Sequence, residues 1–318
     1  MLSGAWRRPV FAAGFALAAA WGAINMELDA FQLHAPGGEH VQCLLKGGRR
    51  CYAQEGENQY TDAEMMRRAW RLVPWMLFNN YRYGRYEAKY APPVANAAGK
   101  DGVGTAGNYL STLFVFRTPK NIVWNEIDIE IMGRYADEVQ YNAITPGPQH
   151  HVYRDRVAFN PHAGFHDYAF EWTPDYVAWF VDGVEAHRQT GAHVGALRRP
   201  QQLMMNVWQP AHLDWAGPFE SADLPLCAEY DDVRYAAYTP GAGTVGTGDA
   251  FTPVWEEPFD VFDWRRWGKG THTFENNNVR FVGGNAGVVD GRLVLCITRP
   301  DAVGLPTGRE ETPATPAG

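Results

Sequence analysis

Three acidic side chains alternate with isoleucines in one short segment of the chain. In Asn125–Ile131, the residues Glu126, Asp128 and Glu130 occupy every second position. Because successive side chains of a β-strand point to opposite faces, these carboxylates would share one face and the isoleucines the other. Like charges side by side on a sheet repel each other, which disfavours a purely structural strand. On the spacing alone, a solvated edge face remains the alternative.

A pair of carboxylates at this spacing can cleave a glycosidic bond. The α-carbons of Glu126 and Glu130 would lie about 13 Å apart in an extended strand. Concave sheet curvature and inclined side chains can bring the two carboxyl groups to about 5–5.5 Å, the separation of nucleophile and acid/base in retaining glycosidases. The acid must stay protonated near neutral pH while the nucleophile stays ionised. Asp128 lies between them and can tune both through like-charge coupling.

The elements that would position these residues are mostly short strands. The chain contains 33 Gly and 21 Pro, which favour turns over long helices. One helix is predicted over Asp62–Val73, where Thr61 and Glu64 form a capping box. The pattern as a whole predicts an all-β sandwich or barrel. The predicted strands are Ser111–Arg117, Asn125–Ile131, Val139–Ala143, Tyr168–Trp172, Val177–Val181, Leu203–Trp208 and Tyr230–Tyr238, with a further group within Phe259–Ile297.

The composition excludes several classes of protein. The chain has 318 residues, of which 46% are hydrophobic, and this content rules out intrinsic disorder. Its net charge is −8, from 28 Lys and Arg against 36 Asp and Glu, and an acidic surface repels nucleic acid. The 12 Trp, 15 Tyr and 16 Phe exceed what a core needs. Their flat faces suit a polymer with apolar sugar faces, with core packing as the alternative.

The N-terminus has the features of an export signal. Arg7 and Arg8 precede an uncharged, Ala-rich run from Pro9 to Met26, and Ala18 and Ala20 provide a small-x-small cleavage site. We therefore expect a signal peptide over residues 1–23 and a secreted or periplasmic protein without stable membrane association. An uncleaved membrane anchor is the alternative.

The four cysteines leave two possibilities open. Cys43, Cys51, Cys227 and Cys296 show no CxxC metal-binding spacing. Cys43 and Cys51 bracket a short loop and could form a local disulfide. The alternative is that all four are free thiols.

Four motifs in the chain resemble glycoside hydrolase family 16. The segment Asn125–Gly133 (NEIDIEIMG) resembles the catalytic strand of that family, and Tyr81–Glu87 (YRYGRYE) is similar to its YxYGxYE strand. Phe165–Trp172 followed by Trp179–Gly183 resembles its HxYAFxW…WyvDG hairpin, and Met204–Trp208 with the later Trp215 resembles its MMNlW…W stretch. Their ordered coincidence between Phe78 and Tyr238 is far more specific than any single motif.

The resemblance implies a fold and a mechanism. The fold is a β jelly-roll sandwich of two antiparallel sheets with a concave substrate cleft. Glu126 would be the nucleophile, Glu130 the acid/base and Asp128 their auxiliary, with net retention and no cofactor for catalysis. The spacing without an inserted residue resembles the lichenase and xyloglucan-active branch, so the expected substrate is β-1,3-1,4-glucan. We expect a monomer.

The same resemblance implies a set of substrate contacts. Phe114 and Phe116 could instead belong to the core, and Gln140 and Asn142 could instead pair with one another. Ile144 stands where lichenases have a Tyr, and Met76 stands near where they have an Arg, so a related β-glucan or exopolysaccharide is an equal expectation. The implied substrate-binding residues are Phe114, Phe116, Gln140, Asn142, Asn206, Trp208 and Trp215.

A structural calcium ion is a further implication of the resemblance. Asp231 matches the carboxylate ligand of lichenase-like members, and Pro258 and Gly291 match positions that give backbone carbonyls. Calcium takes six to eight oxygen ligands, and a solvated Asp at a strand end is the alternative.

The order of the segments predicts a circular permutation. The block from Glu257 to Leu295 resembles the first strands of the family, which ordinarily precede the YxYG strand, yet here it follows the last one. Residues 239–254 would then be a linker joining the usual termini. An unrelated C-terminal extension is the alternative. The expected domains are an N-terminal extension with one helix over 24–75, a catalytic domain over 76–300 and a disordered tail over 301–318.

The predicted function is that of a secreted, endo-acting, retaining β-glucanase. A transglycosylase would use the same carboxylates but pass the glycosyl group to a sugar instead of water. A non-catalytic jelly-roll lectin is a different class, and the three repelling acids Glu126, Asp128 and Glu130 argue against it.

Overall fold

The fold is taken from a computed structural model that describes residues 81–93, 110–117, 124–217, 219, 221–264, 266–271 and 273–306, with three short strands nearer the N-terminus. For residues 116, 117 and 213 and for those three strands, only the backbone is described. The predicted signal peptide, the predicted helix over 62–73, Met76 and the chain beyond 306 lie outside the described residues. The chain divides into two compact units, Met1–Pro74 and Trp75–Gly318.

The described part of the first unit is a small antiparallel sheet. Its three strands, β1 (Gln32–His34), β2 (His40–Leu44) and β3 (Arg50–Ala53), follow one another in order. Cys43 lies directly opposite Cys51 across β2 and β3. The predicted local disulfide concerns side chains outside the described set and stays a prediction.

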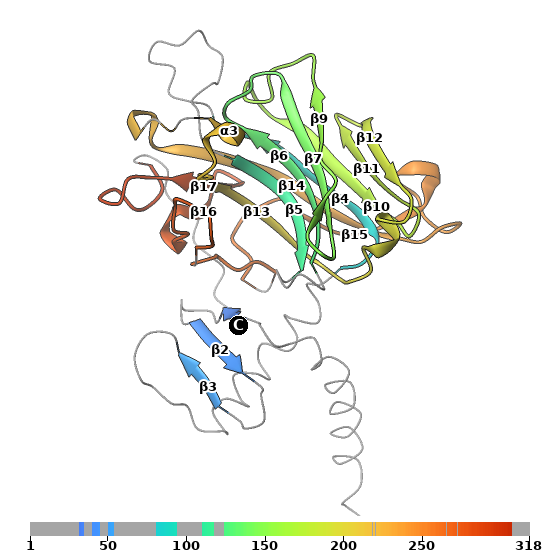
Figure 1. The fold of residues 1–318 in the computed structure, drawn as a ribbon, viewed down its shortest axis with the longest axis horizontal. Coiled ribbons are helices and arrows are strands. Elements are labelled where there is room, and N and C mark those ends of the chain that lie inside the picture. The colour runs from blue at the N-terminus through green and yellow to red at the C-terminus, as the bar shows by residue number, and fades with distance from the viewer. Residues whose placement is uncertain are drawn as a thin grey trace, which may run out of the picture. The chain divides into compact units, whose positions relative to one another are not determined.

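The second unit contains two antiparallel sheets (Figure 1). The larger has eight strands in the order β12-β11-β10-β4-β14-β17-β16, with β15 also paired to β14. Its strands are β4 (Gly84–Ala91), β10 (His166–Trp172), β11 (Tyr176–Val181), β12 (Val184–Thr190), β14 (Leu226–Tyr238), β15 (Phe251–Glu257), β16 (Ala286–Val289) and β17 (Arg292–Ile297).

The smaller sheet carries the acidic strand at its centre. It has six strands in the order β13-β5-β6-β7-β8, with β9 also paired to β7. Its strands are β5 (Leu110–Arg117), β6 (Asn125–Met132), β7 (Glu138–Thr145), β8 (Gln149–His150), β9 (Tyr153–Arg156) and β13 (Gln202–Trp208). The described helical elements are short: one α-helix, α3 (Leu213–Ala216), and the 3₁₀ turns Val194–Ala196, Ser221–Asp223, Thr247–Asp249 and Gly283–Asn285.

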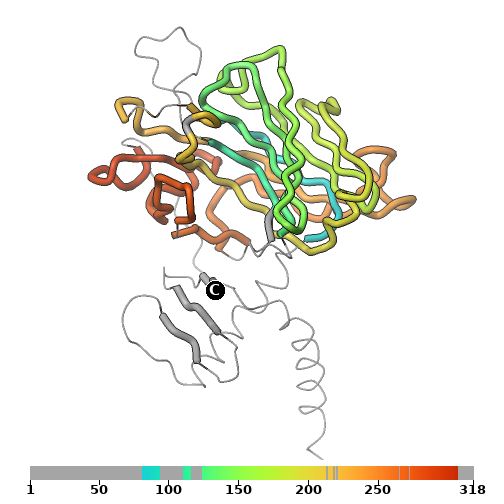
Figure 2. The backbone as a smooth tube through the Cα atoms, viewed as in Figure 1, coloured from blue at the N-terminus to red at the C-terminus, as the bar shows by residue number. Residues whose placement is uncertain are grey.

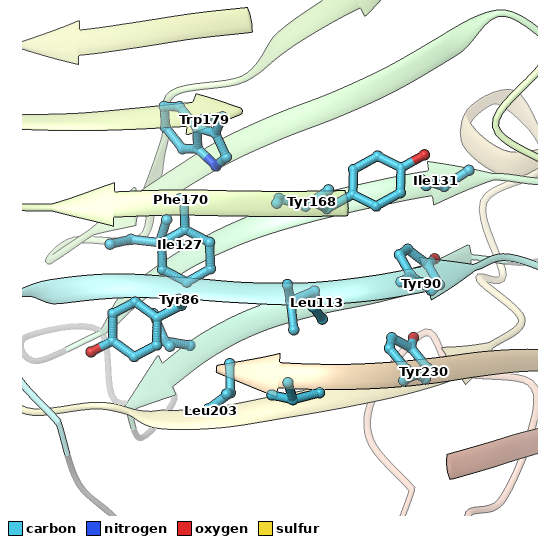
Figure 3. Close-up of a cluster of buried hydrophobic side chains, with 14 of the residues drawn as sticks. Tyr86, Tyr90, Leu113, Ile127, Ile131, Tyr168, Phe170, Trp179, Leu203 and Tyr230 are labelled. Atoms are coloured by element: carbon cyan, nitrogen blue, oxygen red, sulfur yellow. The ribbon is translucent and has the colours of Figure 1, made fainter. Parts of the chain in front are cut away.

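The core fills the space between the two sheets (Figure 3). Ile127, Ile129 and Ile131 point into it from β6, because the alternation of the sequence matches the period of a strand. Tyr86 of β4 stacks on Phe170 of β10 with ring centroids 4.8 Å apart. The prediction of an all-β sandwich of two antiparallel sheets is therefore confirmed.

One glycine explains part of the YRYG motif. A β-carbon at Gly84 would lie 2.4 Å from the Tyr235 ring and 2.7 Å from the Ala236 carbonyl oxygen. Only a residue without a side chain therefore lets β4 approach β14 so closely at this point.

The C-terminal block belongs to the same sandwich (Figure 2). Strand β17 pairs with the first half of β14, and β15 pairs with the second half. Phe259, Leu293 and Ile297 lie in the main core cluster. The predicted linker over 239–254 is therefore wrong in its last part, because β15 begins at Phe251.

Two further findings differ from the sequence-based expectations. A disulfide joins Cys227 of β14 to Cys296 of β17, with an S–S distance of 2.07 Å, so the alternative of four free thiols is wrong. The start of the predicted disordered tail is packed: Leu305 contacts the cluster around Val289, and the Gly304 amide donates to Asn285 over 2.7 Å. Within the described residues, no helix is long and apolar enough to cross a membrane.

Candidate active site

Cross-strand pairing arranges the polar face of the smaller sheet in three rows. The face is the one opposite the core, since directly paired residues on neighbouring strands point to the same side. Each row contains one carboxylate of β6. The rows are Gln202–Phe116–Glu126–Ile144–His150, Met204–Phe114–Asp128–Asn142 and Asn206–Thr112–Glu130–Gln140–Arg154.

Glu126 receives two stabilising hydrogen bonds. The indole N–H of Trp124 donates to Glu126 Oε2 over 2.5 Å, and Asp128 donates a second bond. Burial raises the pKa of Glu126 to about 7, and both donors oppose this shift because they stabilise the charged form. The side chain remains partly accessible to solvent, as a nucleophile must be.

Asp128 is the most confined of the three acids. Only 4% of it is exposed. Burial raises the pKa of its carboxyl group well above the usual range, and the negative charges of Glu126 and Glu130 raise it further. We therefore infer that Asp128 is the protonated member of this pair at neutral pH. Its O–H donates a hydrogen bond to Glu126.

Glu130 has a different set of neighbours. It is 7% exposed and accepts a hydrogen bond from the Gln140 amide nitrogen. Burial raises the pKa of Glu130 to about 7, with the Gln140 bond and the charge of Arg154 lowering it and the charge of Glu126 raising it. A carboxyl group with a pKa near 7 can both give and take a proton near neutral pH.

The neighbouring amides orient the carboxylates and do not pair with one another. Asn142 accepts the backbone N–H of His151 over 3.1 Å and contacts His150 Nδ1 at 3.3 Å. Its hydrogen bond to Asp128 lowers the pKa of that acid. Gln140 accepts Arg154 Nε over 3.0 Å.

The core side fixes the backbone beneath the carboxylates. The indole of Trp179, fully buried in β11, donates to the backbone oxygen of Asp128 over 2.9 Å. Tyr230 of β14 donates to the Thr112 carbonyl over 2.8 Å. These bonds satisfy polar atoms that would otherwise be buried without partners, and they tie the larger sheet to the strands of the site.

The predicted substrate contacts Phe114, Phe116 and Asn206 belong to the three rows of the polar face. Phe114 pairs with Asp128, so it lies on the carboxylate face and not in the core. Phe116 pairs with Glu126 in the backbone register, and its side chain is outside the described set. Asn206 accepts the Thr112 hydroxyl over 2.7 Å.

An aromatic cluster stands at the end of β13. The ring of Trp208 makes edge contacts with Trp215 of α3 at 5.9 Å and with Phe274 at 5.0 Å. The segment carrying Phe274 is held beside the end of β13 by the Ala211 amide donating to the Asn276 carbonyl over 2.8 Å. Phe274 is 40% exposed, so this cluster presents an apolar surface to solvent.

Sequence reasoning missed several of these residues. Trp124 directly precedes the acidic strand, and an indole two positions from a carboxylate was the available signal. Arg154, His150 and Phe274 had no such signal, because they reach the site through strand pairing or through the C-terminal block.

Strand pairing places the three possible calcium ligands next to neighbouring strand ends. Tyr230 pairs with Leu293 and Val233 pairs with Glu257, so Asp231 lies between the start of β17 and the end of β15. Pro258 and Gly291 adjoin those two strand ends. The described residues contain no group of three or more His, Cys, Asp or Glu side chains that could hold a metal ion.

Comparison with known proteins assigns the family. The model of glycosyl hydrolases family 16 matches residues 78–223. A β-glucanase of Paenibacillus polymyxa is 37% identical over 202 residues, which cover 63% of this chain and 79% of that protein. The chain belongs to glycosyl hydrolases family 16.

Other similar proteins cover different shares of the chain. A β-glucanase of Fibrobacter succinogenes is 36% identical over 231 residues, 69% of this chain and 61% of the length of that relative. The solved β-glucanase of Bacillus licheniformis is 30% identical and covers 49% of this chain and 67% of its own, with a TM-score of 0.42. The family assignment rests on the sequence relatives.

Proposed function

We propose that this protein is a secreted, endo-acting, retaining β-glucanase that cleaves β-1,3-1,4-glucan or a related β-glucan or exopolysaccharide. The observation that carries the proposal is the set of three carboxylates on one polar sheet face, with the pKa values of Glu126 and Glu130 both raised to about 7. Two relatives of this chain are named β-glucanases.

The two glutamates take different roles because their donors differ. Glu126, which accepts hydrogen bonds from Trp124 and Asp128, is the nucleophile and attacks the anomeric carbon. Glu130 gives its proton to the departing glycosidic oxygen as that bond breaks. Glu130 then takes a proton from water, which attacks the same carbon and releases Glu126. Two inversions give net retention.

Two features support the remaining parts of the proposal. The aromatic cluster of Trp208 and the 40% exposed Phe274 suits an apolar sugar face. The disulfide Cys227–Cys296 is of a kind that persists in oxidising compartments, which agrees with the export signal expected over residues 1–23.

The experiment is a reducing-sugar screen over barley β-glucan, lichenan, laminarin, xyloglucan and bacterial exopolysaccharides, with Glu126→Gln as the matched control. We expect cleavage of a β-glucan by the wild type and none by the variant, because an amide cannot form the glycosyl ester. Proton NMR of the first product should show the β-anomer. Transfer to an added acceptor oligosaccharide in place of hydrolysis would indicate a transglycosylase, and binding without cleavage a lectin.

We also propose a structural calcium ion held by the Asp231 carboxylate and the backbone carbonyls of Pro258 and Gly291. One oxygen of Asp231 already accepts the Asp232 amide over 2.9 Å, which leaves the other for an ion. Water would supply the remaining ligands of a six- to eight-coordinate site. Calcium should raise the melting temperature of the wild type and leave that of Asp231→Asn unchanged. An equal response of both proteins would contradict the site.

A further inference from the structure

Arg154 ends the polar row that crosses the sheet through Glu130. In this row Asn206, Thr112, Glu130, Gln140 and Arg154 are paired strand by strand from β13 to β9. Gln140 donates to Glu130, and Arg154 Nε donates to Gln140 Oε1 over 3.0 Å. A continuous chain of donors therefore leads from β9 to the carboxyl group of Glu130.

The direction of these hydrogen bonds is set by Arg154. A primary amide has one accepting oxygen and one donating nitrogen, whereas a guanidinium group only donates. With Arg154 at the Gln140 oxygen, the nitrogen of that amide must face Glu130. The reversed amide would place its carbonyl oxygen against a carboxylate and its N–H groups against a cation.

Arg154 is itself held from several sides. Its Nη1 lies 3.5 Å from Glu138 Oε1 and 3.4 Å from the Tyr135 hydroxyl, and its guanidinium lies 5.7 Å from the Tyr135 ring centroid. The side chain is 39% exposed. These contacts restrict the orientation of a group that would otherwise be mobile on a surface strand.

We propose that Arg154 is a positioning residue for the acid/base, which fixes the amide of Gln140 and stabilises the ionised form of Glu130. The inference rests on the proposed function, because it assigns a role within that reaction. Ionised Glu130 is needed after each proton transfer to the leaving group, when it acts as the base toward water.

The charges around Glu130 agree with this role. On its own strand it faces Asp128 and Glu126, and the paired residues on β5 and β7, Thr112 and Gln140, are neutral. Among the described residues, the charges that shift the pKa of Glu130 are those of Glu126, which raises it, and Arg154, which lowers it. Loss of Arg154 therefore raises this pKa.

The test compares four full-length proteins. Arg154→Met removes both the charge and the donor, and Arg154→Lys keeps the charge but lacks the Nε–H. Arg156→Met is the matched control, because Arg156 lies on the same strand with an 83% exposed side chain, 3.6 Å from Asp137. Each protein is assayed across pH on β-glucan and on an activated aryl glycoside, and its melting temperature is measured.

We expect Arg154→Met to move the basic limb of the kcat/KM profile upward by about 0.5–1 pH unit. Its kcat should fall about 3–10-fold on the aryl glycoside, whose leaving group needs no proton, because hydrolysis of the glycosyl-enzyme, in which ionised Glu130 is the base, is common to both substrates. Arg154→Lys should keep the wild-type limb but lose part of the rate, and Arg156→Met should match the wild type.

A profile of Arg154→Met that coincides with that of Arg156→Met overturns the inference, as does a wild-type kcat of Arg154→Met on the aryl glycoside. If Arg154→Met does not fold, Arg154→Gln replaces it, with the same expected shift and the same contradiction. A wild type inactive on every β-glucan would overturn the proposed function instead, so the two failures are distinguishable.

Discussion

The three carboxylates of β6 have the same chemistry and different surroundings. Glu126 accepts an indole N–H, Glu130 accepts an amide that Arg154 orients, and Asp128 lies between two negative charges. Their roles follow from these neighbours, since environment decides which carboxyl group keeps a proton. Each role can be tested separately.

Glu130→Ala should be nearly inactive on β-glucan and partly active on an activated aryl glycoside. The reason is that an aryl leaving group departs without a proton, whereas a sugar hydroxyl does not. We expect a loss of about 10²–10⁴-fold on the polysaccharide, the usual contribution of general acid–base catalysis. Initial rates on the two substrates measure this difference. Equal losses would remove the acid/base assignment.

Asp128→Asn should lower the rate of hydrolysis and raise stability at alkaline pH. Folding raises the pKa of Glu126 and Glu130 from 4.5 to about 7, so between these values the native state binds more protons than the unfolded chain. Stability is then full below pH 4.5 and falls as the pH rises through 7. Removing one acid from this cluster makes the loss of stability at high pH smaller.

Thermal unfolding at pH 5 and pH 8 measures the effect of Asp128→Asn. The variant should exceed the wild type by about 1–3 kcal/mol at pH 8 and by little at pH 5. Asp137→Asn, which removes an exposed acid paired with Arg156, is the control and should change neither. A variant less stable than the wild type at pH 8 would contradict the repulsion between the three acids.

At the scale of elements, the end of β13 collects aromatic rings from three segments. Trp208→Ala should raise KM on long β-glucans about tenfold, equivalent to about 1.4 kcal/mol, and change kcat less. This follows if its stacking on sugar is the same in the ground and transition states. Trp264→Ala, which removes a 41% exposed ring packed on Phe262, is the control. Unchanged KM with reduced stability would assign Trp208 a packing role only.

Strands with clean alternation were predictable, and those without it were not. Strand β6 was recognised because its isoleucines and acids follow a period of two without interruption. Strands β9 (YRDR) and β12 (VEAHRQT) carry polar residues on both faces, so no apolar face marks them. Strand β15 contains a proline, which argues against a strand unless it lies at an edge or bulge.

The central residues of the site were predictable for the same reason, and their partners were not. Glu126, Asp128 and Glu130 lie on one strand, so their spacing in the sequence alone determines how they are arranged in the structure. Arg154 reaches Glu130 through two strand pairings, and register between strands cannot be read from composition. The Cys227–Cys296 bond likewise depends on the pairing of β14 with β17.

At the scale of the whole molecule, the C-terminal block completes the larger sheet. Deleting everything after residue 250 removes β15, β16 and β17 and leaves one edge of β14 unpaired. It also removes Phe259 and Leu293 from the core, at a cost of about 2–5 kcal/mol for each large side chain. We expect an insoluble or molten protein without glucanase activity. Deletion of residues 307–318 is the control and should be harmless.

We propose that this arrangement is a circular permutation of the family order. A variant chain with residues 253–300 placed ahead of residue 76 should then fold and cleave β-glucan. A soluble, cooperatively unfolding and active truncation at residue 250 would make the block an accessory and contradict the permutation. Solubility, circular dichroism and the reducing-sugar assay separate these outcomes.

The Cys227–Cys296 disulfide provides a second covalent connection between β14 and the C-terminal strands, besides the segment 239–250. Cys227 and Cys296 enclose a sequence separation of 69 residues, so this stretch forms a covalent ring that contains the exposed segment 239–250 as well as β15–β17. A single break in that segment opens the ring without releasing anything. The C-terminal strands would remain tethered at a high effective concentration beside β14, and their docking would remain a unimolecular event. The disulfide, and not the peptide bonds of segment 239–250, is therefore what keeps the C-terminal strands attached to β14 after such a break.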